Sequence, residues 1–181
     1  MRAAPSICIR MLLLLGFLGF GGVPQVRAQE ESKEEIQYRD DYERAQKIVA
    51  IPDTSKRADQ LLLFLRERSN SKMNDYVQGN LFHILDEYIK AGNNSEILAL
   101  SERYIKMRPK VGETYYFYGY GLKNTEKFAE AMEALAKCYL IKNSISSKAK
   151  DFLDLVYKNR NKGSSAGEDA FIKKVQQDLN K

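Results

Sequence analysis

Few residues of this 181-residue chain have the types and spacing that catalysis or metal binding requires. The single histidine, His83, and the two cysteines, Cys8 and Cys138, are far apart in the sequence and form no metal-ligand or nucleophile–base pattern. Neighbouring carboxylates such as Glu34 and Glu35 point to different faces of a helix, so they do not form a catalytic pair. We therefore predict no catalytic residue, no metal site and no cofactor, and a protein that is not an enzyme.

Two further positions could carry chemistry of their own. Cys138 falls in an apolar stripe without a histidine or basic cluster beside it, so we expect a small buried side chain rather than a reactive thiol. Asn93-Asn94-Ser95 has the form of an N-glycosylation acceptor, which matters only in a host that glycosylates exported proteins. Neither position points to an activity.

Residues 1–28 have the three parts of a secretory signal peptide. Arg2 and Arg10 give a positive start, residues 11–20 are apolar and uncharged, and Val26-Arg27-Ala28 places small residues where signal peptidase cleaves. We predict cleavage after Ala28 and export of the remaining chain. An uncleaved membrane anchor is the alternative, although the apolar run, even if extended to Val23, is shorter than the ~20 residues that a spanning helix needs.

After cleavage the chain is nearly neutral. The 29 basic residues include Arg2, Arg10 and Arg27, so 26 basic and 24 acidic residues remain, a net charge of +2. Nucleic-acid binding needs a clustered basic face, whereas these charges alternate in sign along most of the expected helices. We predict no nucleic-acid partner and, because no other apolar run approaches spanning length, no membrane span after cleavage.

Composition and periodicity predict an all-α protein. The chain is 44% hydrophobic and 29% charged, which is typical of a folded domain, and apolar residues recur at spacings of three and four. Helix ends are indicated by the capping box Ser32-x2-Glu35, by Pro52 and by Gly92. The expected helices cover residues 32–50, 53–68, 72–91, 95–107, 112–123, 126–142, 148–161 and 168–179.

The strongest internal pattern lies in residues 112–142. A glycine inside a helix costs up to ~1 kcal/mol relative to alanine, so Gly119 indicates a place where two helices cross closely. The pattern consists of Tyr115-x2-Tyr118-Gly119-x2-Leu122, then Ala131-x3-Leu135, then Cys138. It resembles the tetratricopeptide repeat, a helical hairpin of about 34 residues.

A second, degenerate copy stands one repeat length earlier, where Leu81, Ile84, Leu85 and Tyr88 take the equivalent positions. Weaker copies flank these two, and the resemblance covers about residues 34–162. It implies a short solenoid of stacked antiparallel helical hairpins over residues 29–162, followed by a flexible connection and a C-terminal capping helix in residues 163–181. A generic helical bundle is the alternative architecture.

With its signal peptide, the chain is similar to the exported tetratricopeptide proteins of bacterial envelopes, which are periplasmic or extracellular. The resemblance implies a non-catalytic protein–protein interaction module that binds a peptide or protein on a concave face, lined by the first helix of each hairpin. The residues implied for this face are Phe82, Asp86, Lys90, Tyr116, Tyr120 and Lys123. Those implied for packing between helices are Tyr88, Tyr115, Tyr118, Gly119, Leu122, Ala131, Leu135 and Cys138.

Two other functions stay open at this point. The chain could be a structural or self-associating envelope protein, because the ends of a solenoid associate unless a polar face caps them. It could also be an accessory subunit of an enzyme complex. The last expected helix carries Phe171, Val175 and Leu179 on one stripe and polar residues elsewhere, as a cap does, so we predict a monomer.

Overall fold

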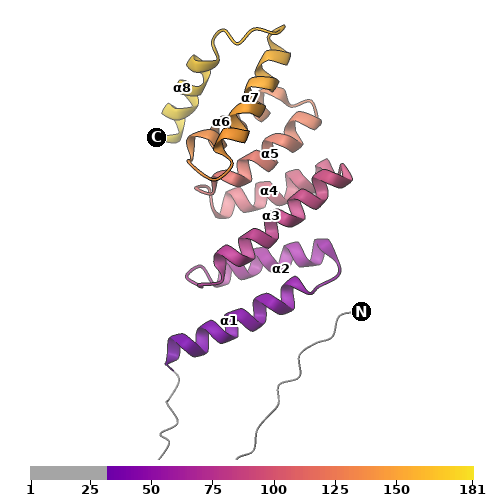
Figure 1. Ribbon diagram of the computed structural model, residues 1–181, viewed down its shortest axis with the longest axis vertical. Coiled ribbons are helices and arrows are strands. Elements are labelled where there is room, and N and C mark those ends of the chain that lie inside the picture. Colours follow the sequence, from indigo (N-terminus) through magenta and orange to yellow (C-terminus); the bar gives the residue numbers. More distant parts are fainter. Residues whose placement is uncertain (1–31) are drawn as a thin grey trace, which may run out of the picture. The chain divides into compact units, whose positions relative to one another are not determined.

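The computed structural model describes residues 32–181, which form one unit of eight helices without a strand (Figure 1). The helices are α1 (Lys33–Val49), α2 (Thr54–Glu67), α3 (Asn74–Ala91), α4 (Asn94–Met107), α5 (Gly112–Asn124), α6 (Phe128–Leu140), α7 (Ser146–Arg160) and α8 (Glu168–Leu179). The all-α class and the order of the helices are confirmed. The predicted signal peptide, residues 1–28, lies outside the described residues.

Local sequence signals set several helix ends. Glu35 N donates a hydrogen bond to Ser32 Oγ at 3.2 Å, and Ser32 N donates to Glu35 Oε2 at 2.7 Å, which completes the expected capping box. At the start of α2, Lys56 N donates to Asp53 Oδ1 at 2.6 Å. α6 begins later than predicted because Glu126 takes a left-handed φ of 63° between α5 and α6.

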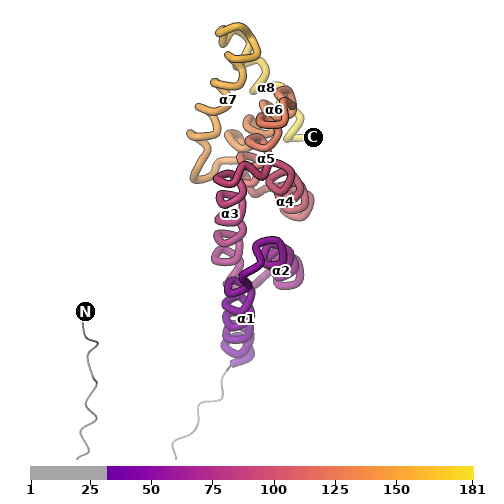
Figure 2. Tube along the Cα trace, turned by 90° about the vertical axis from the view of Figure 1, so that its right-hand side faces the viewer, coloured from indigo at the N-terminus to yellow at the C-terminus, as the bar shows by residue number. Residues whose placement is uncertain are grey.

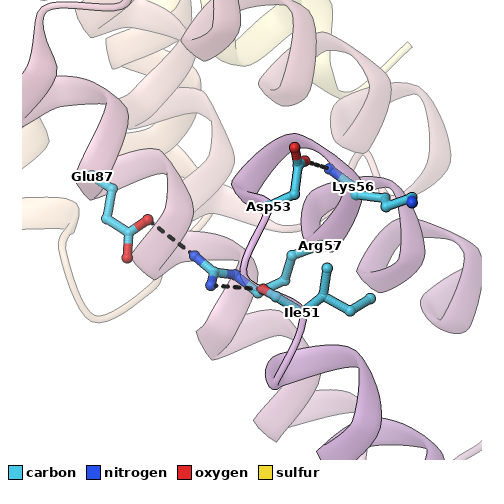
Figure 3. A network of polar contacts seen from close by, with 5 residues as sticks. All are labelled: Ile51, Asp53, Lys56, Arg57 and Glu87. Carbon is cyan, nitrogen blue, oxygen red and sulfur yellow. Dashed lines mark hydrogen bonds and ion pairs between the residues drawn. The ribbon is translucent and has the colours of Figure 1, made fainter.

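A polar network ties the turn between α1 and α2 to the next hairpin (Figure 3). Arg57 of α2 donates from Nη1 to the carbonyl oxygen of Ile51 at 3.2 Å. The same guanidinium donates from Nη2 to Glu87 Oε2 on α3 at 3.1 Å. One side chain therefore fixes the start of α2 against both the preceding turn and the following helix.

Helices α1 to α7 pack mainly against their neighbours in the chain, and short turns join these neighbours as antiparallel pairs, whereas α8 packs against α6 rather than α7. Further contacts join α2 to α4, α5 to α7 and α6 to α8, so that odd-numbered and even-numbered helices form two rows (Figure 2). One hydrophobic cluster runs through the unit, from Ala45 of α1 to Val175 of α8.

Polar contacts anchor α8 at its first residue. Lys150 Nζ donates to Glu168 Oε1 at 2.7 Å and also to Asp154 Oδ1, and Glu168 is buried. The Tyr157 hydroxyl donates to the carbonyl oxygen of Ala166 at 3.1 Å. The connection between α7 and α8 is thus held by side chains of α7.

Candidate partner-binding surface

Five aromatic side chains make a chain of ring contacts across α3, α5 and α7, and we call this set the aromatic ladder. Phe82 of α3 stacks on Phe117 of α5, with ring centroids 5.6 Å apart and an interplanar angle of 27°. Phe117 meets Tyr116 edge-on at 5.8 Å. Phe152 of α7 then contacts both Tyr116, at 5.9 Å, and Tyr120, at 6.0 Å. The ladder arises because residues 115–120 place aromatic rings on every side of α5.

The members of the aromatic ladder differ in how much solvent they meet. Tyr116 is 8% exposed and Phe117 is 5% exposed, whereas Phe82, Tyr120 and Phe152 are half-buried. The Lys148 ammonium also lies over the Tyr116 ring, 4.6 Å from its centroid. Tyr116 therefore does not offer the open surface that its spacing suggested, because α7 covers it with Phe152 and Lys148.

The charged residues predicted for the same surface remain accessible. Asp86 and Lys90 are exposed and follow Phe82 on one stripe of α3. Lys123 of α5 is half-buried, and its Nζ donates to Asn124 Oδ1 at 3.3 Å. The contact between Phe82 and Phe117 joins α3 to α5 on this surface.

The residues expected between helices belong to α5 and α6, except for Tyr88, which lies on α3. An added Cβ on Gly119 would lie 2.9 Å from Leu135 Cγ and 3.3 Å from the carbonyl oxygen of Ala131, so only a glycine fits without a shift. The Tyr115 hydroxyl donates to the carbonyl oxygen of Pro109 at 3.0 Å. Leu122, Ala131, Leu135, Cys138 and Tyr115 are buried, while Tyr88 and Tyr118 are half-buried.

Two buried titratable groups lie beside this surface. The Tyr104 hydroxyl donates to Gln78 Oε1 at 2.6 Å, and burial raises the pKa of Tyr104 to about 12. Burial likewise raises the pKa of the Cys138 thiol to about 11, so the sulfur stays protonated at neutral pH and is not nucleophilic. Both groups stabilise the packed helices in their neutral forms.

The prediction that the chain contains no G-x-S-x-G motif is wrong, because residues 163–167 read Gly-Ser-Ser-Ala-Gly, which has the form of a nucleophile elbow. A nucleophile elbow needs a strand followed by a tight turn and a helix. Here the central Ser165 is exposed in the loop between α7 and α8. The pentapeptide therefore lacks the structural context that gives this motif its chemistry.

The even-numbered row carries two hollows that the sequence did not predict. A groove of about 560 Å³ lies between α2 and α4, and another of about 310 Å³ lies among α4, α5 and α6. In the sequence, the charged residues that line these grooves have the spacing of an ordinary solvent-exposed helix face. No pattern along the chain indicates how far apart α2 and α4 lie, so these grooves could not be predicted from the sequence.

Within residues 32–181, no helix is both long and apolar enough to cross a membrane. In the same part of the chain, no three His, Cys, Asp or Glu side chains are grouped so as to hold a metal ion. Compared with known proteins, the chain matches no family model, no curated protein and no solved structure.

Proposed function

We propose that the chain is a non-catalytic protein–protein interaction module that binds a protein or peptide on the odd-numbered row of a tetratricopeptide-like stack of hairpins. The observation that carries this proposal is the aromatic ladder, which joins three successive odd-numbered helices. Half-exposed aromatic side chains give a partner a large contact area at little cost in conformational entropy. Phe82, Tyr120 and Phe152 are the members that keep part of their surface accessible.

Charged residues beside the aromatic ladder would orient the partner. Asp86 and Lys90 stand on the same stripe as Phe82, and Lys123 follows Tyr120 along α5. A segment with apolar side chains between residues of both charge signs fits this set. In this assignment the buried side chains of Tyr116 and Phe117 pack beneath the accessible rings and hold them in position.

We also propose that the module is exported and acts in a periplasm or outside the cell. The support is the signal-peptide pattern of residues 1–28, with small residues before Gln29. N-terminal sequencing of the protein isolated from its native host should begin at Gln29. Mature protein that retains its first 28 residues would contradict this proposal.

The binding surface can be tested with a charge exchange that leaves net charge and core packing unchanged. Asp86→Lys combined with Lys90→Glu reverses two exposed charges beside Phe82. Lys174→Glu combined with Asp178→Lys, on α8, is the matched control because it also exchanges an exposed i,i+4 pair. In affinity capture with quantitative mass spectrometry, a specific partner should be lost from the α3 variant and retained by the control. Equal recovery by both variants, with unchanged circular dichroism, would refute the assignment of this surface.

Self-association is a second candidate function, and a specific surface favours it. Three large hydrophobic side chains of α1 are exposed: Ile36 at 40%, Tyr38 at 46% and Tyr42 at 46%, with the two tyrosine rings 6.4 Å apart. Such a patch on a terminal helix fits a contact with a second copy. Sedimentation analysis should then show a dimer. The double variant Tyr38→Ser with Tyr42→Ser should dissociate this dimer, and the control double variant Tyr139→Ser with Leu155→Ser, at exposed positions outside α1, should leave it intact. A wild-type monomer at all concentrations rules this function out.

A further inference from the structure

The groove between α2 and α4 lies on the even-numbered row, away from the aromatic ladder, and its shape is fixed by buried contacts. Tyr104 of α4 is fully buried, and its hydroxyl is bonded to Gln78 of α3. Arg108, which follows α4, donates from Nη2 to the carbonyl oxygen of Leu65 in the last turn of α2 at 3.0 Å. The two helices are therefore held in place at their C-terminal ends, and the groove exists before any ligand arrives.

The groove combines an apolar floor with a basic rim. Leu62, Leu63 and Met107 supply the apolar part of its lining, and Leu63 and Met107 are half-buried. Three cations also line it: Arg66 from α2 and Arg103 and Lys106 from α4. Asp59 is the one acidic residue of the lining, so positive charge is in excess.

All three cations are accessible to a ligand carboxylate, because two of them are held only by exposed ion pairs and the third has none in the described residues. Arg66 has no acidic partner within residues 32–181. Arg103 pairs with Asp59 across the groove at 2.8 Å, and each of these side chains is 54% exposed. Lys106 pairs with Glu102 at 2.7 Å, also between exposed side chains. Exposed ion pairs contribute little to stability, so a ligand carboxylate can replace Asp59 or Glu102.

We propose that this groove binds an acidic segment of a partner protein. The carboxylates of the segment pair with Arg66, Arg103 and Lys106, and its apolar side chains rest on Leu62, Leu63 and Met107. Charge complementarity favours an acidic occupant, since the lining carries three cations against the single carboxylate of Asp59, and Arg66 is the cation without an acidic partner in the described residues. The apolar floor favours a peptide with apolar side chains over an inorganic polyphosphate, which has no group with which to cover it.

Fluorescence anisotropy with two labelled peptides tests this proposal on the purified protein. One peptide repeats Leu and Glu at helical spacing, and the other carries Gln in place of every Glu. We expect saturable binding of the Glu peptide, at least about tenfold tighter than that of the Gln peptide and weaker at high salt. Arg66→Glu combined with Arg103→Glu should weaken it by about tenfold or more.

The matched control is Lys142→Glu combined with Lys173→Glu, which changes net charge equally at exposed positions outside the groove. This control should bind the Glu peptide as tightly as the wild type does. A second variant, Leu63→Gln, removes part of the apolar floor without changing charge and should also weaken binding. Circular dichroism confirms that each variant is folded.

Three results would overturn the proposal. Equal losses in the groove variant and the charge control would show attraction to net charge alone. Equal affinity for the Glu and Gln peptides, or no saturable binding up to about 1 mM, would remove the acidic segment as the ligand. A short single-stranded DNA that binds more tightly than the Glu peptide and is unaffected by Leu63→Gln would assign the groove to a nucleic acid instead.

Discussion

The close crossing of α5 and α6 gives a sharp prediction, because two glycines in helix interiors differ only in what surrounds them. At Gly119 an added Cβ would lie 2.9 Å from Cγ and 3.1 Å from Cδ2 of the fully buried Leu135. At Gly79 in α3, nothing lies within 4 Å of an added Cβ. Alanine should therefore destabilise the protein at the first position and stabilise it at the second.

The expected magnitudes follow from two opposing effects. Replacing a helical glycine with alanine stabilises the helix by about 1 kcal/mol, and at Gly79 this is the whole effect. At Gly119 the extra methyl group overpacks the core, which costs about 2 kcal/mol and leaves a net destabilisation of about 1 kcal/mol. For a protein of this size the corresponding changes in Tm are about 3 °C in opposite directions.

Urea denaturation followed by circular dichroism, together with thermal melts, measures both variants against the wild type. Gly121→Ala extends the test to the crossing of α4 and α5, since its Cβ would lie 3.0 Å from Cγ of Leu98. This variant should also be destabilised. If Gly119→Ala raises Tm as much as Gly79→Ala does, α5 and α6 do not cross as closely as the structure has them, and the packing argument fails.

Three further predictions concern single groups. Cys138 should react with Ellman's reagent at pH 8 only after unfolding, because its thiol is buried and its pKa is raised to about 11; prompt reaction of the folded protein would contradict this. Tyr104→Phe should cost about 1 kcal/mol by removing the bond to Gln78. Burial raises the pKa of Tyr104 from 10.0 to about 12, so the neutral hydroxyl contributes fully to the free energy of unfolding below pH 10 and this contribution is lost as pH rises through 12. Between pH 10 and 12 the Tyr104→Phe variant should therefore lose less stability than the wild type does in alkaline titrations. Asp53→Ala should lower stability by about 1 kcal/mol in urea titrations, whereas Asp53→Asn should retain most of the cap; equal losses would argue against capping of α2.

The sequence predicted the helices well because their ends depend on nearby residues. The capping box at Ser32 and Glu35 and the cap at Asp53 each join residues three apart, so they can be identified without a fold. The glycine at position 119 also indicated a close crossing before any partner helix was known. Such signals are local, or depend on a single small residue.

The surfaces were less predictable because they depend on how separate hairpins meet. The spacing of residues 115–120 shows that some rings cannot lie in the core, but not that Phe152 of α7 covers Tyr116. Similarly, the groove between α2 and α4 depends on two contacts between distant parts of the chain. Tyr104 of α4 donates to Gln78 of α3, and Arg108, which follows α4, donates to the carbonyl oxygen of Leu65 of α2. Contacts between residues so far apart in the chain have no periodic signature in one sequence.

The central claim, that the odd-numbered row recognises a protein partner, is tested most directly by photo-crosslinking in the native host. A photoreactive p-benzoylphenylalanine in place of Asp86 lies beside Phe82, and the same residue in place of Lys174 on α8 is the control. Discrete higher-mass adducts are expected from position 86 and should be absent from position 174. No adduct from position 86, or the same adducts from both positions, would contradict this claim.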